Sequence, residues 1–411
     1  MDHLLVPLRS WKQTMHLHSY RIKNYRRLQD VLIELDPDIS IFVGSNNSGK
    51  TSATQAIHAF LRASKERFSV YDFCSICWNE FDELGELAAD AEFPHPLPAI
   101  SLDLWFGVTA ADLALVLPLL PSMDWQGTQV GIRIEYAARS QVELLDNFRT
   151  TRKTALAQAA ALPARNNEQY VPWPKSLTDY LKDELASEFE FRYYVLDRSN
   201  FDNNYLPLPN HMPLPLGNDP GGAAILKSLI KVDNLSAQRH LADPDTGNSS
   251  SGGRSEDLSK RLSRFYKRNL DQRQEDHNAL RALFDSEVGL NSHLATVFEE
   301  TLNQLSDLGY PGLNNPRLEI RSALNPATIM SSQDARVHYV LGDGNAAPRL
   351  PDSYNGLGFK HLIYMVVEIL DLHAAWIAEE DRRAPLHIIF IEEPEAHLHA
   401  QLQQVFIRKV L

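Results

Sequence analysis

Cysteine is scarce in this chain of 411 residues, which contains only Cys74 and Cys77. Two cysteines cannot form the disulfide framework of a small secreted domain, so we expect a reducing compartment. The two residues form a Cys-x-x-Cys pair, which is half of a common zinc site. Zinc needs about four ligands, however, and the sequence has no second pair. We therefore predict two packed, buried thiols in preference to a metal or redox site.

Long apolar runs and excess positive charge are also missing. No run approaches the roughly 20 apolar residues of a membrane helix, and the first residues lack the apolar segment of a signal peptide, which predicts a cytoplasmic protein. The 40 Lys and Arg residues are outnumbered by 53 Asp and Glu, giving a formal net charge of -13. If DNA is a partner, it must be bound through a local basic patch or through the geometry of a dimer. The 44% hydrophobic content is ordinary for a globular chain with one large core or two smaller ones.

The N-terminal part carries the clearest periodicity. Alternating apolar residues between His18 and Leu35 predict a β-hairpin around a basic cluster. The apolar run Ile39 to Val43 then predicts a strand that leads into a glycine-rich loop. Residues 53–61 follow with helical spacing, so the order is strand, loop, helix.

The remaining segments complete an α/β pattern. Apolar and polar residues alternate over 100–108 and 130–136, which predicts half-solvated antiparallel strands in a β-subdomain beside a parallel sheet. Two stretches rich in Pro, Gly or Ser, 206–222 and 243–255, predict loops. Residues 255–308 have few helix breakers and predict a helical insertion. Further strands are expected at 318–322 and 337–341, a helix at about 358–378, and a buried strand at 388–391.

The strongest motif is a phosphate-binding loop. Its eight residues fit the G-x-x-x-x-G-K-[ST] pattern, known as Walker A, between a predicted strand and a predicted helix. They are Gly44, Ser45, Asn46, Asn47, Ser48, Gly49, Lys50 and Thr51. Successive backbone N–H groups of such a loop point at phosphate oxygens, and the following helix adds its positive N-terminal end. We expect Lys50 to reach the β and γ phosphates of ATP and the Thr51 hydroxyl to bind Mg²⁺.

A second candidate site is the end of the late apolar run. Ile388 to Ile391 precede Glu392 and Glu393, as in a central strand that delivers carboxylates at its C-terminal edge, the Walker B arrangement. We expect Glu392 to orient Mg²⁺ or its water ligands, although aspartate is usual at this position. Glu393 would position and polarise the attacking water, because γ-phosphoryl transfer needs in-line attack and charge neutralisation. Both acids could also be a solvated strand end.

At this point the sequence resembles a known family. The segments that carry the resemblance are Tyr20–Arg27, the phosphate loop, 232–239, Ser353–Lys360 and Ile391–His399. In this order they are similar to the ABC-type ATPase heads of overcoming-lysogenization-defect (OLD) nucleases. Related heads occur in chromosome-structure and DNA-repair ATPases of the SMC and RecF type. The resemblance implies an ABC-type P-loop head with a mixed sheet, an antiparallel β-subdomain and a helical insertion.

The resemblance also implies a trans-acting signature motif. Asn355, Gly356 and Gly358 would contact the γ-phosphate of ATP bound on a partner subunit, so that two heads enclose two nucleotides. The expected assembly is therefore a homodimer or a larger even-numbered oligomer. Leu357 departs from the double glycine of transporter heads, and the glycines could merely begin a helix. His397 and His399, after the acidic strand, would lie near the dimer seam in either a structural or a functional role.

The resemblance leads to an expected division of the chain. Lobe I would span 15–240 with Walker A and the β-subdomain. The insertion would span 241–310 and take part in dimerisation, and lobe II would span 311–411 with the signature and Walker B. OLD nucleases continue into a Toprim nuclease domain, which the segment after Glu393 does not supply, so we expect no DNA cleavage by this chain alone. The sequence stops at Leu411 within the expected helix, which suggests a longer natural protein.

Two basic clusters are candidates for DNA contacts. The first, on the insertion, contains Lys260, Arg261, Arg264, Lys267 and Arg268. The second contains Arg21, Lys23, Arg26 and Arg27 near the phosphate loop. Either could neutralise phosphates or form an ordinary solvated surface.

Three functional hypotheses remain open from the sequence. The first is the ATPase head of an OLD-type nuclease that defends against phage. The second is a stand-alone ATPase that recruits a separately encoded nuclease or toxin. The third is a nucleotide-sensing dimerisation switch that hydrolyses ATP slowly.

Overall fold

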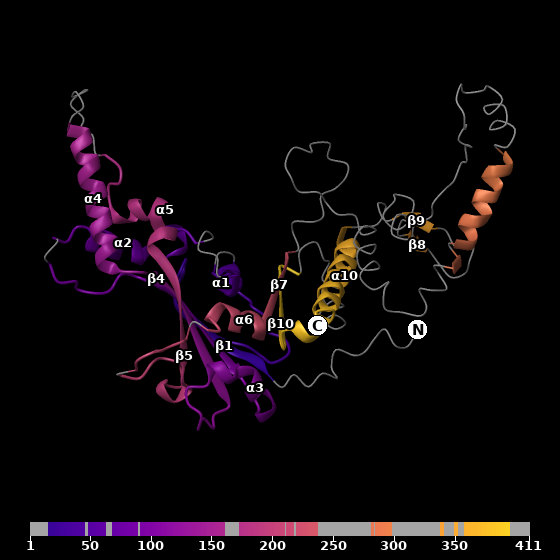
Figure 1. Ribbon diagram of the computed structural model, residues 1–411, viewed down its shortest axis with the longest axis horizontal. Helices are drawn as coiled ribbons and strands as arrows, with labels where there is room; N and C mark the ends of the chain where they lie inside the picture. The colour runs from indigo at the N-terminus through magenta and orange to yellow at the C-terminus, as the bar shows by residue number, and fades with distance from the viewer. Residues whose placement is uncertain are drawn as a thin grey trace, which may run out of the picture. The chain divides into compact units, whose positions relative to one another are not determined.

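The computed structural model describes residues 15–45, 48–62, 68–88, 91–160, 172–209, 211–217, 219–236, 281–282, 284–297, 338–340, 349–351 and 357–394. They belong to two compact units, each with its own internal packing (Figure 1). The first unit takes Met1–Asp233 with Glu380–Phe390, and the second takes Asn234–Glu379 with Ile391–Leu411. This division is discontinuous in sequence, whereas the expected lobes are continuous; the expected boundaries stay a prediction.

A six-stranded antiparallel sheet in the order β2-β1-β3-β4-β5-β6 forms the frame of the first unit. Its strands are β1 (His16–Tyr25), β2 (Leu28–Glu34), β3 (Ile100–Gly107), β4 (Gln129–Ala138), β5 (Phe189–Leu196) and β6 (Leu214–Pro215). The predicted hairpin is confirmed as β1 and β2, which pair from Ser19–Glu34 to Tyr25–Leu28. The predicted strand pair at 100–108 and 130–136 is confirmed as β3 and β4.

One face of this sheet is the main hydrophobic core. Because side chains alternate along a strand, Tyr20 and Ile22 of β1 share this face with Leu104 and Leu102 of β3. Helix α1 (Lys50–Arg62) belongs to the same core through a stripe at i, i+3, i+4 and i+7, formed by Ala53, Ala56, Ile57 and Phe60. Arg62 in the last turn complements the negative end of the helix dipole. The predicted helix after the phosphate loop is therefore confirmed.

The opposite face of the sheet is half-solvated along β4, where Gln129, Arg133 and Glu135 are half-buried as the sequence alternation predicts, but it is covered at β3. All eight residues of β3 are buried. On this face Trp105 packs with Leu196, Phe201 and Tyr205, the last two from the segment that follows β5. Polar side chains on a strand are exposed to solvent only where no other segment packs over them. Here the segment after β5 folds back across the sheet, and its contacts are not visible in the pattern of a single strand.

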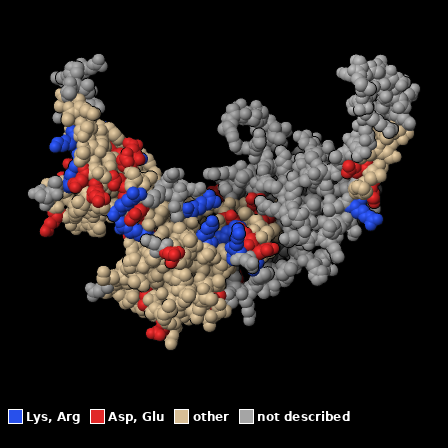
Figure 2. Space-filling view, viewed as in Figure 1, with Lys and Arg blue, Asp and Glu red and all other residues tan. Residues whose placement is uncertain are grey.

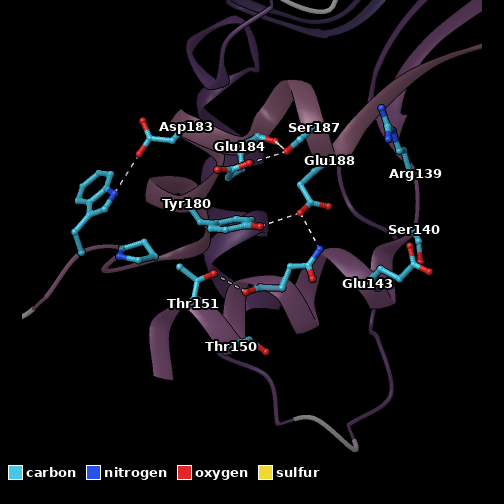
Figure 3. A pocket seen from close by; sticks show the side chains of 13 residues that line it. Arg139, Ser140, Glu143, Thr150, Thr151, Tyr180, Asp183, Glu184, Ser187 and Glu188 are labelled. Atoms are coloured by element: carbon cyan, nitrogen blue, oxygen red, sulfur yellow. Dashed lines mark hydrogen bonds between the residues drawn. The ribbon is translucent and has the colours of Figure 1, made fainter. Parts of the chain in front are cut away.

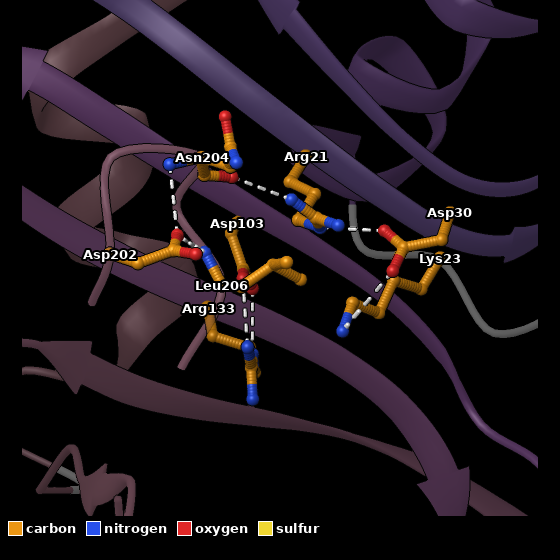
Figure 4. A network of polar contacts seen from close by, with 8 residues as sticks. All are labelled: Arg21, Lys23, Asp30, Asp103, Arg133, Asp202, Asn204 and Leu206. Atoms are coloured by element: carbon orange, nitrogen blue, oxygen red, sulfur yellow. Dashed lines mark hydrogen bonds and ion pairs between the residues drawn. The ribbon is translucent and has the colours of Figure 1, made fainter. Parts of the chain in front are cut away.

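A buried polar network lies on this covered face (Figure 4). Arg133 of β4 donates two hydrogen bonds to the Asp103 carboxylate of β3, at 2.6 and 2.8 Å. Arg21 of β1 donates to Asp30 at 2.6 Å and to the backbone carbonyl of Asn204 at 2.8 Å. The charged residues that looked solvent-facing in the sequence therefore neutralise one another and hold the covering segment.

Three helices of the first unit form a group at one end of the sheet (Figure 1). The group consists of α2 (Ser75–Gly85), α4 (Gln141–Ala160) and α5 (Leu177–Glu188). Phe81, Leu84, Phe148 and Leu181 are buried in it. Short elements join the larger ones: α3 (Leu113–Val116), the 3-10 turns η3 (Val70–Asp72), η4 (Ala110–Asp112), η5 (Leu117–Leu119), η6 (Arg198–Asn200) and η10 (Glu380–Arg382). Helix α6 (Gly222–Leu229), which leads directly into β7 (Ile230–Ser236), buries Ile225, Leu226 and Leu229 in the main core.

The predicted strand at Ile39 to Val43 is wrong. The segment forms no ladder with any strand in the described residues, and the side chains of Ile39, Ile41 and Val43 are 40%, 66% and 90% exposed. β2 ends at Glu34, and the chain turns away through Asp36, whose backbone N–H donates to Ser40 Oγ at 2.8 Å. An apolar run becomes a strand only where a sheet edge pairs with its backbone, and this run lacks such a partner.

The later elements of the chain are described in part. β10 (Leu386–Glu392) pairs with β7, and β8 (His338–Val340) pairs with β9 (Arg349–Pro351). These pairs and α10 (Leu357–Ile377) confirm the predicted strands near 337–341 and 388–391 and the predicted helix near 358–378. A parallel sheet remains a prediction, as does the strand at 318–322, which lies outside the described residues. In the predicted loop 206–222, the structure has the short strand β6.

The predicted helical insertion is described only at 281–282 and 284–297, which are helical. Its remainder and the predicted loop at 243–255 lie outside the described residues. No helix in the described ranges is both long enough and apolar enough to serve as a membrane span.

Candidate nucleotide site

The second half of the phosphate loop forms the N-terminus of α1. Gly49 has a φ of 97°, a backbone conformation that L side chains rarely adopt, and its carbonyl accepts the first helical hydrogen bond from Ala53 N–H at 2.9 Å. Just before it, Ser48 N–H donates to the Ser45 carbonyl at 3.3 Å. Asn46 and Asn47 lie outside the described residues. The described part of the loop therefore has a glycine with positive φ followed directly by a helix N-terminus, which are the features that a phosphate site requires.

The Lys50 ammonium folds back over its own loop. Its Nζ donates to the Gly44 carbonyl and, at 2.9 Å, to the Ser45 carbonyl. Lys50 is half-buried, whereas Gly44, Ser45 and Thr51 are exposed. Both acceptors are neutral carbonyls, so no carboxylate neutralises the ammonium. The charged oxygens of a phosphate group can displace these carbonyls as hydrogen-bond acceptors. The loop residues thus fit an anionic phosphate ligand.

The second predicted group of site residues ends β10. Within the described part of the chain, Glu392 Oε1 is buried and has no hydrogen-bond partner. Glu393 follows with a φ of 50°, the left-handed conformation, and is exposed. A buried carboxylate oxygen without a donor is costly unless it meets a cation, and oxygen ligands are what Mg²⁺ prefers. The Glu392 carboxylate is therefore chemically suited to a divalent ion, and a metal site shared with Thr51 stays a prediction.

The two groups of predicted site residues belong to different units. Lys50 lies in the first, and Glu392 and Glu393 lie in the second. The earlier residues of β10 belong to the first unit, where Leu386 and Phe390 share the main core with Ile57 and Phe60 of α1. The joining of Lys50 and Glu393 in one active site stays a prediction.

The other predicted site residues are described incompletely. Asn355 and Gly356 lie outside the described residues, and Gly358 is the second residue of α10. Gly358 therefore lies in the first turn of a helix of 21 residues, and the role of the three residues as a signature motif stays a prediction. His397 and His399 also lie outside the described residues.

Cys74 and Cys77 are free, buried thiols around the start of α2. Burial, with smaller effects from Glu80 and Cys74, raises the pKa of the Cys77 thiol to about 12. No group of three or more His, Cys, Asp or Glu side chains arranged to hold a metal occurs among the described residues. Packing accounts for both thiols, in agreement with the predicted structural role.

The basic cluster near the phosphate loop is largely committed to internal ion pairs. Arg21 is 8% exposed and pairs with Asp30, which also lies 3.6 Å from Lys23. Arg26 donates to Asp72 at 2.8 Å and to Gln55 of α1 at 2.6 Å. The prediction that this cluster forms a DNA-binding patch is therefore not supported for these three residues. The basic cluster on the predicted insertion, 260–268, lies outside the described residues.

A polar cavity of about 750 Å³ lies between α4 and α5 (Figure 3), and none of the predicted nucleotide residues lines it. Within its wall, Glu188 accepts hydrogen bonds from Asn147 at 3.0 Å and from Tyr180 at 2.8 Å. Asp183 accepts from Trp173 at 3.3 Å. Acidic side chains gather over this part of the surface (Figure 2). Carboxylates that line a cavity repel phosphate groups, so the cavity does not suit a nucleotide triphosphate.

Sequence reasoning missed one polar pair. His387 of β10 and Asp233 of β7 contact each other at 2.8 Å across the β10–β7 sheet. A signal was present only for His387, which is a lone titratable residue inside an apolar run and so requires a partner in a buried strand, whereas Asp233 stands between Lys231 and Asn234 in a mixed segment. The pairing of two strands 154 residues apart could not be read from local periodicity.

Comparisons with known proteins extend these observations. Endonuclease GajA from Bacillus cereus (strain HuB5-5) is 21% identical over 390 residues, which cover 92% of this chain and 49% of GajA. The DNA replication and repair protein RecF from Lactococcus lactis subsp. cremoris (strain SK11) is 35% identical over 65 residues, 16% of this chain and 18% of RecF. The chain thus spans about half the length of GajA, and the match to RecF is confined to one segment.

One solved structure, from work on ATP-driven dimerization and DNA stimulated activation of SMC ATPases, is 15% identical. The aligned region covers 32% of this chain and 76% of the chain in that structure, and the TM-score of 0.20 is too low to support an argument. The family comparison is far more extensive, because residues 15–411 match the AAA ATPase domain. With a phosphate loop at the start of α1 and an acidic strand end at β10, this chain belongs to the AAA ATPase domain family.

Proposed function

We propose that this chain is the ATP-binding and ATP-hydrolysing head of an OLD-type DNA nuclease whose nuclease activity lies outside these 411 residues. The observation that carries the proposal is the phosphate loop, which turns at Gly49 into the N-terminus of α1 with Lys50 as the first helical residue. Family membership and the similarity to an endonuclease over 92% of the chain support it. Defence against phage is the role that the OLD resemblance favours.

In the proposed reaction each group has a separate task. Backbone N–H groups of Gly44 to Thr51 and the Lys50 ammonium bind the phosphates. The Thr51 hydroxyl and the Glu392 carboxylate hold Mg²⁺, which neutralises charge on the phosphate oxygens when bound. The Glu393 carboxylate orients a water molecule and accepts its proton. Since γ-phosphoryl transfer requires mainly positioning and electrostatic stabilisation, these are the groups that one subunit contributes.

The proposed active form is a homodimer or a larger even-numbered oligomer. Asn355, Gly356 and Gly358 of one subunit would complete the γ-phosphate site of the other. Binding of ATP would then favour association, and hydrolysis would favour release. DNA is the proposed macromolecular partner, and we propose that ATP-dependent association regulates a nuclease domain or a separate nuclease or toxin effector. We place this soluble assembly in the cytoplasm.

A second candidate is a DNA-repair ATPase without its own nuclease. The 35% identity to RecF, although limited to 65 residues, favours it. The two functions differ in what accompanies the ATPase, not in how ATP is bound. The sequence of the gene beyond Leu411 separates them, since a metal-binding acidic domain favours the nuclease and its absence favours the repair protein.

The decisive experiment compares the wild type with Glu393→Gln. The variant keeps the shape of the side chain but cannot accept a proton, so it should bind ATP normally and lose at least about a hundredfold in turnover. It should also accumulate as an ATP-bound dimer, measured by light scattering after size-exclusion chromatography. Turnover at the wild-type rate in Glu393→Gln would contradict the assigned role, and no turnover in the wild type would favour the slowly hydrolysing switch.

A further inference from the structure

The pair formed by His387 and Asp233 lies on the same strand ladder as the acidic end of β10. The imidazole Nε2 of His387 is 2.8 Å from Asp233 Oδ2. The His387 side chain is 5% exposed and that of Asp233 25% exposed. The two residues therefore join β10 to β7 by a largely buried side-chain contact in addition to the backbone pairing.

A contact of this kind has a specific consequence for the pairing of β10 with β7, which the described residues contain. The register of two paired strands is fixed by which side chains must face the core. On β10, Leu386 and Phe390 are buried in the main core, while His387 lies on the alternate face and meets Asp233. A slip by one residue would move His387 into the apolar core and separate it from Asp233. The core residues and the pair thus specify the same register from opposite faces.

The charge on Asp233 strengthens the contact. The hydrogen bond from His387 and nearby positive charge, including Lys231 and Arg62, lower the pKa of Asp233, although its partial burial acts in the opposite direction. A carboxylate that is ionised and bonded inside a sheet is costly to separate from its donor. Breaking the register would therefore leave a half-buried charge without compensation.

The strand held in this way carries Glu392 and Glu393, five and six residues after His387. We propose that His387 and Asp233 are a positioning pair: they fix the register of β10 against β7 and so determine where the two acids lie for metal binding and attack by water. The inference rests on the proposed ATPase function. Neither residue touches the reacting atoms, and their effect is transmitted through the backbone of β10.

The test uses the whole chain in three forms: wild type, His387→Leu and His387→Gln. Leucine fills the buried space without a donor, whereas the glutamine amide Nε2 can still donate to Asp233. His95→Leu is the matched control, because the His95 ring hydrogen-bonds to the carbonyl of the neighbouring Pro96, and the His95 carbonyl that accepts from Gln141 is kept by the substitution. Two measurements are made on each: hydrogen–deuterium exchange of the backbone amides of 386–392, and steady-state ATP turnover with Mg²⁺.

We expect His387→Leu to exchange faster in β10 and to lose roughly ten- to a hundredfold in kcat with KM changed by less than about threefold. His387→Gln should restore both towards wild type, and His95→Leu should change neither. Unchanged exchange in His387→Leu, unchanged kcat, or equal loss in the Leu and Gln variants would overturn the positioning role. If the wild type itself lacks turnover, the proposed ATPase function fails, and the exchange measurement alone then decides whether the pair holds the strand.

Discussion

Gly49 lies directly against Leu28: a Cβ atom built on Gly49 would be 2.9 Å from Leu28 Cδ2, closer than real Cβ contacts allow. The hairpin of β1 and β2 thus packs against the phosphate loop at the residue whose φ is 97°. Any side chain at position 49 meets both an unfavourable backbone conformation and a core leucine.

Gly49→Ala should therefore weaken nucleotide binding at least about tenfold and destabilise the fold by roughly 1–2 kcal/mol. Gly217→Ala is the control, because Gly217 is exposed and nothing lies within 4 Å of the added Cβ. Binding of a fluorescent ATP analogue and thermal unfolding measure the two effects. Normal affinity in Gly49→Ala would mean that the loop binds nucleotide in a different conformation.

Lys50→Ala should remove the charged contact to the phosphates while leaving the fold intact, since within the described residues the Lys50 ammonium donates to two carbonyls of its own loop. A charge-assisted hydrogen bond contributes about 1.5–3 kcal/mol, which corresponds to a loss of roughly ten- to a hundredfold in ATP affinity. Lys182→Ala is a suitable control, because Lys182 pairs with Asp179 on α5. Equal ATP affinity in both variants would exclude Lys50 as a phosphate ligand.

The local elements of this fold could be predicted from sequence because their signals are local. The alternation of β1 and β2, the 3.6-residue stripe of α1 and the glycine pattern of the phosphate loop each depend on neighbouring residues, and the structure contains all three. The acids at the end of β10 were found in the same way. Helices α4 and α5 were not predicted, although the stripe of Leu177, Leu181 and Leu185 in α5 is a local signal that could have shown that helix.

The long-range features could not be predicted. The segment that covers Asp103 and Arg133 comes from beyond β5, and the partner of His387 is 154 residues away. Ile39 to Val43 shows the opposite error, because the apolar pattern was correct for a strand but no strand of the described residues pairs with it. In each case the structure depends on which segments lie next to one another, and this is set by the topology of the whole chain.

The buried ion pair of Asp103 and Arg133 provides a stability prediction. Their side chains are 2% and 14% exposed. Asp103→Ala leaves a buried guanidinium without its carboxylate and should cost about 3–5 kcal/mol in free energy of unfolding. Asp103→Leu combined with Arg133→Met should cost much less, because no charge stays buried. As a control, Glu86→Ala at the exposed pair with Arg152 should cost less than about 1 kcal/mol in the same urea titration.

The lowered pKa of Asp233 predicts a pH dependence. A carboxyl group whose folded pKa lies below its unfolded value near 3.8 stabilises the fold above that value, and the stabilisation is lost as the pH falls through the folded pKa. Asp233→Asn should therefore unfold at a lower temperature than wild type at pH 6, by roughly 2–4 °C for about 1 kcal/mol. The difference should shrink below pH 4. A difference that stays constant to pH 3 would show that the pair does not depend on the charge of Asp233.

The thiol of Cys77 predicts a pH dependence of stability with the opposite sign. Its pKa is raised by burial from 9.0 to about 12, so the folded thiol stays protonated where the unfolded one ionises, and stability falls as the pH rises above 9. At pH 8 the folded thiolate fraction is roughly one in ten thousand, and labelling of the native protein by a disulfide reagent should be at least about a hundredfold slower than labelling in urea. Cys74→Ala leaves Cys77 as the only thiol and assigns the signal. Rapid labelling of native Cys77, or zinc that co-purifies in proportion to the protein, would show that the Cys-x-x-Cys pair is a reactive or metal-binding site.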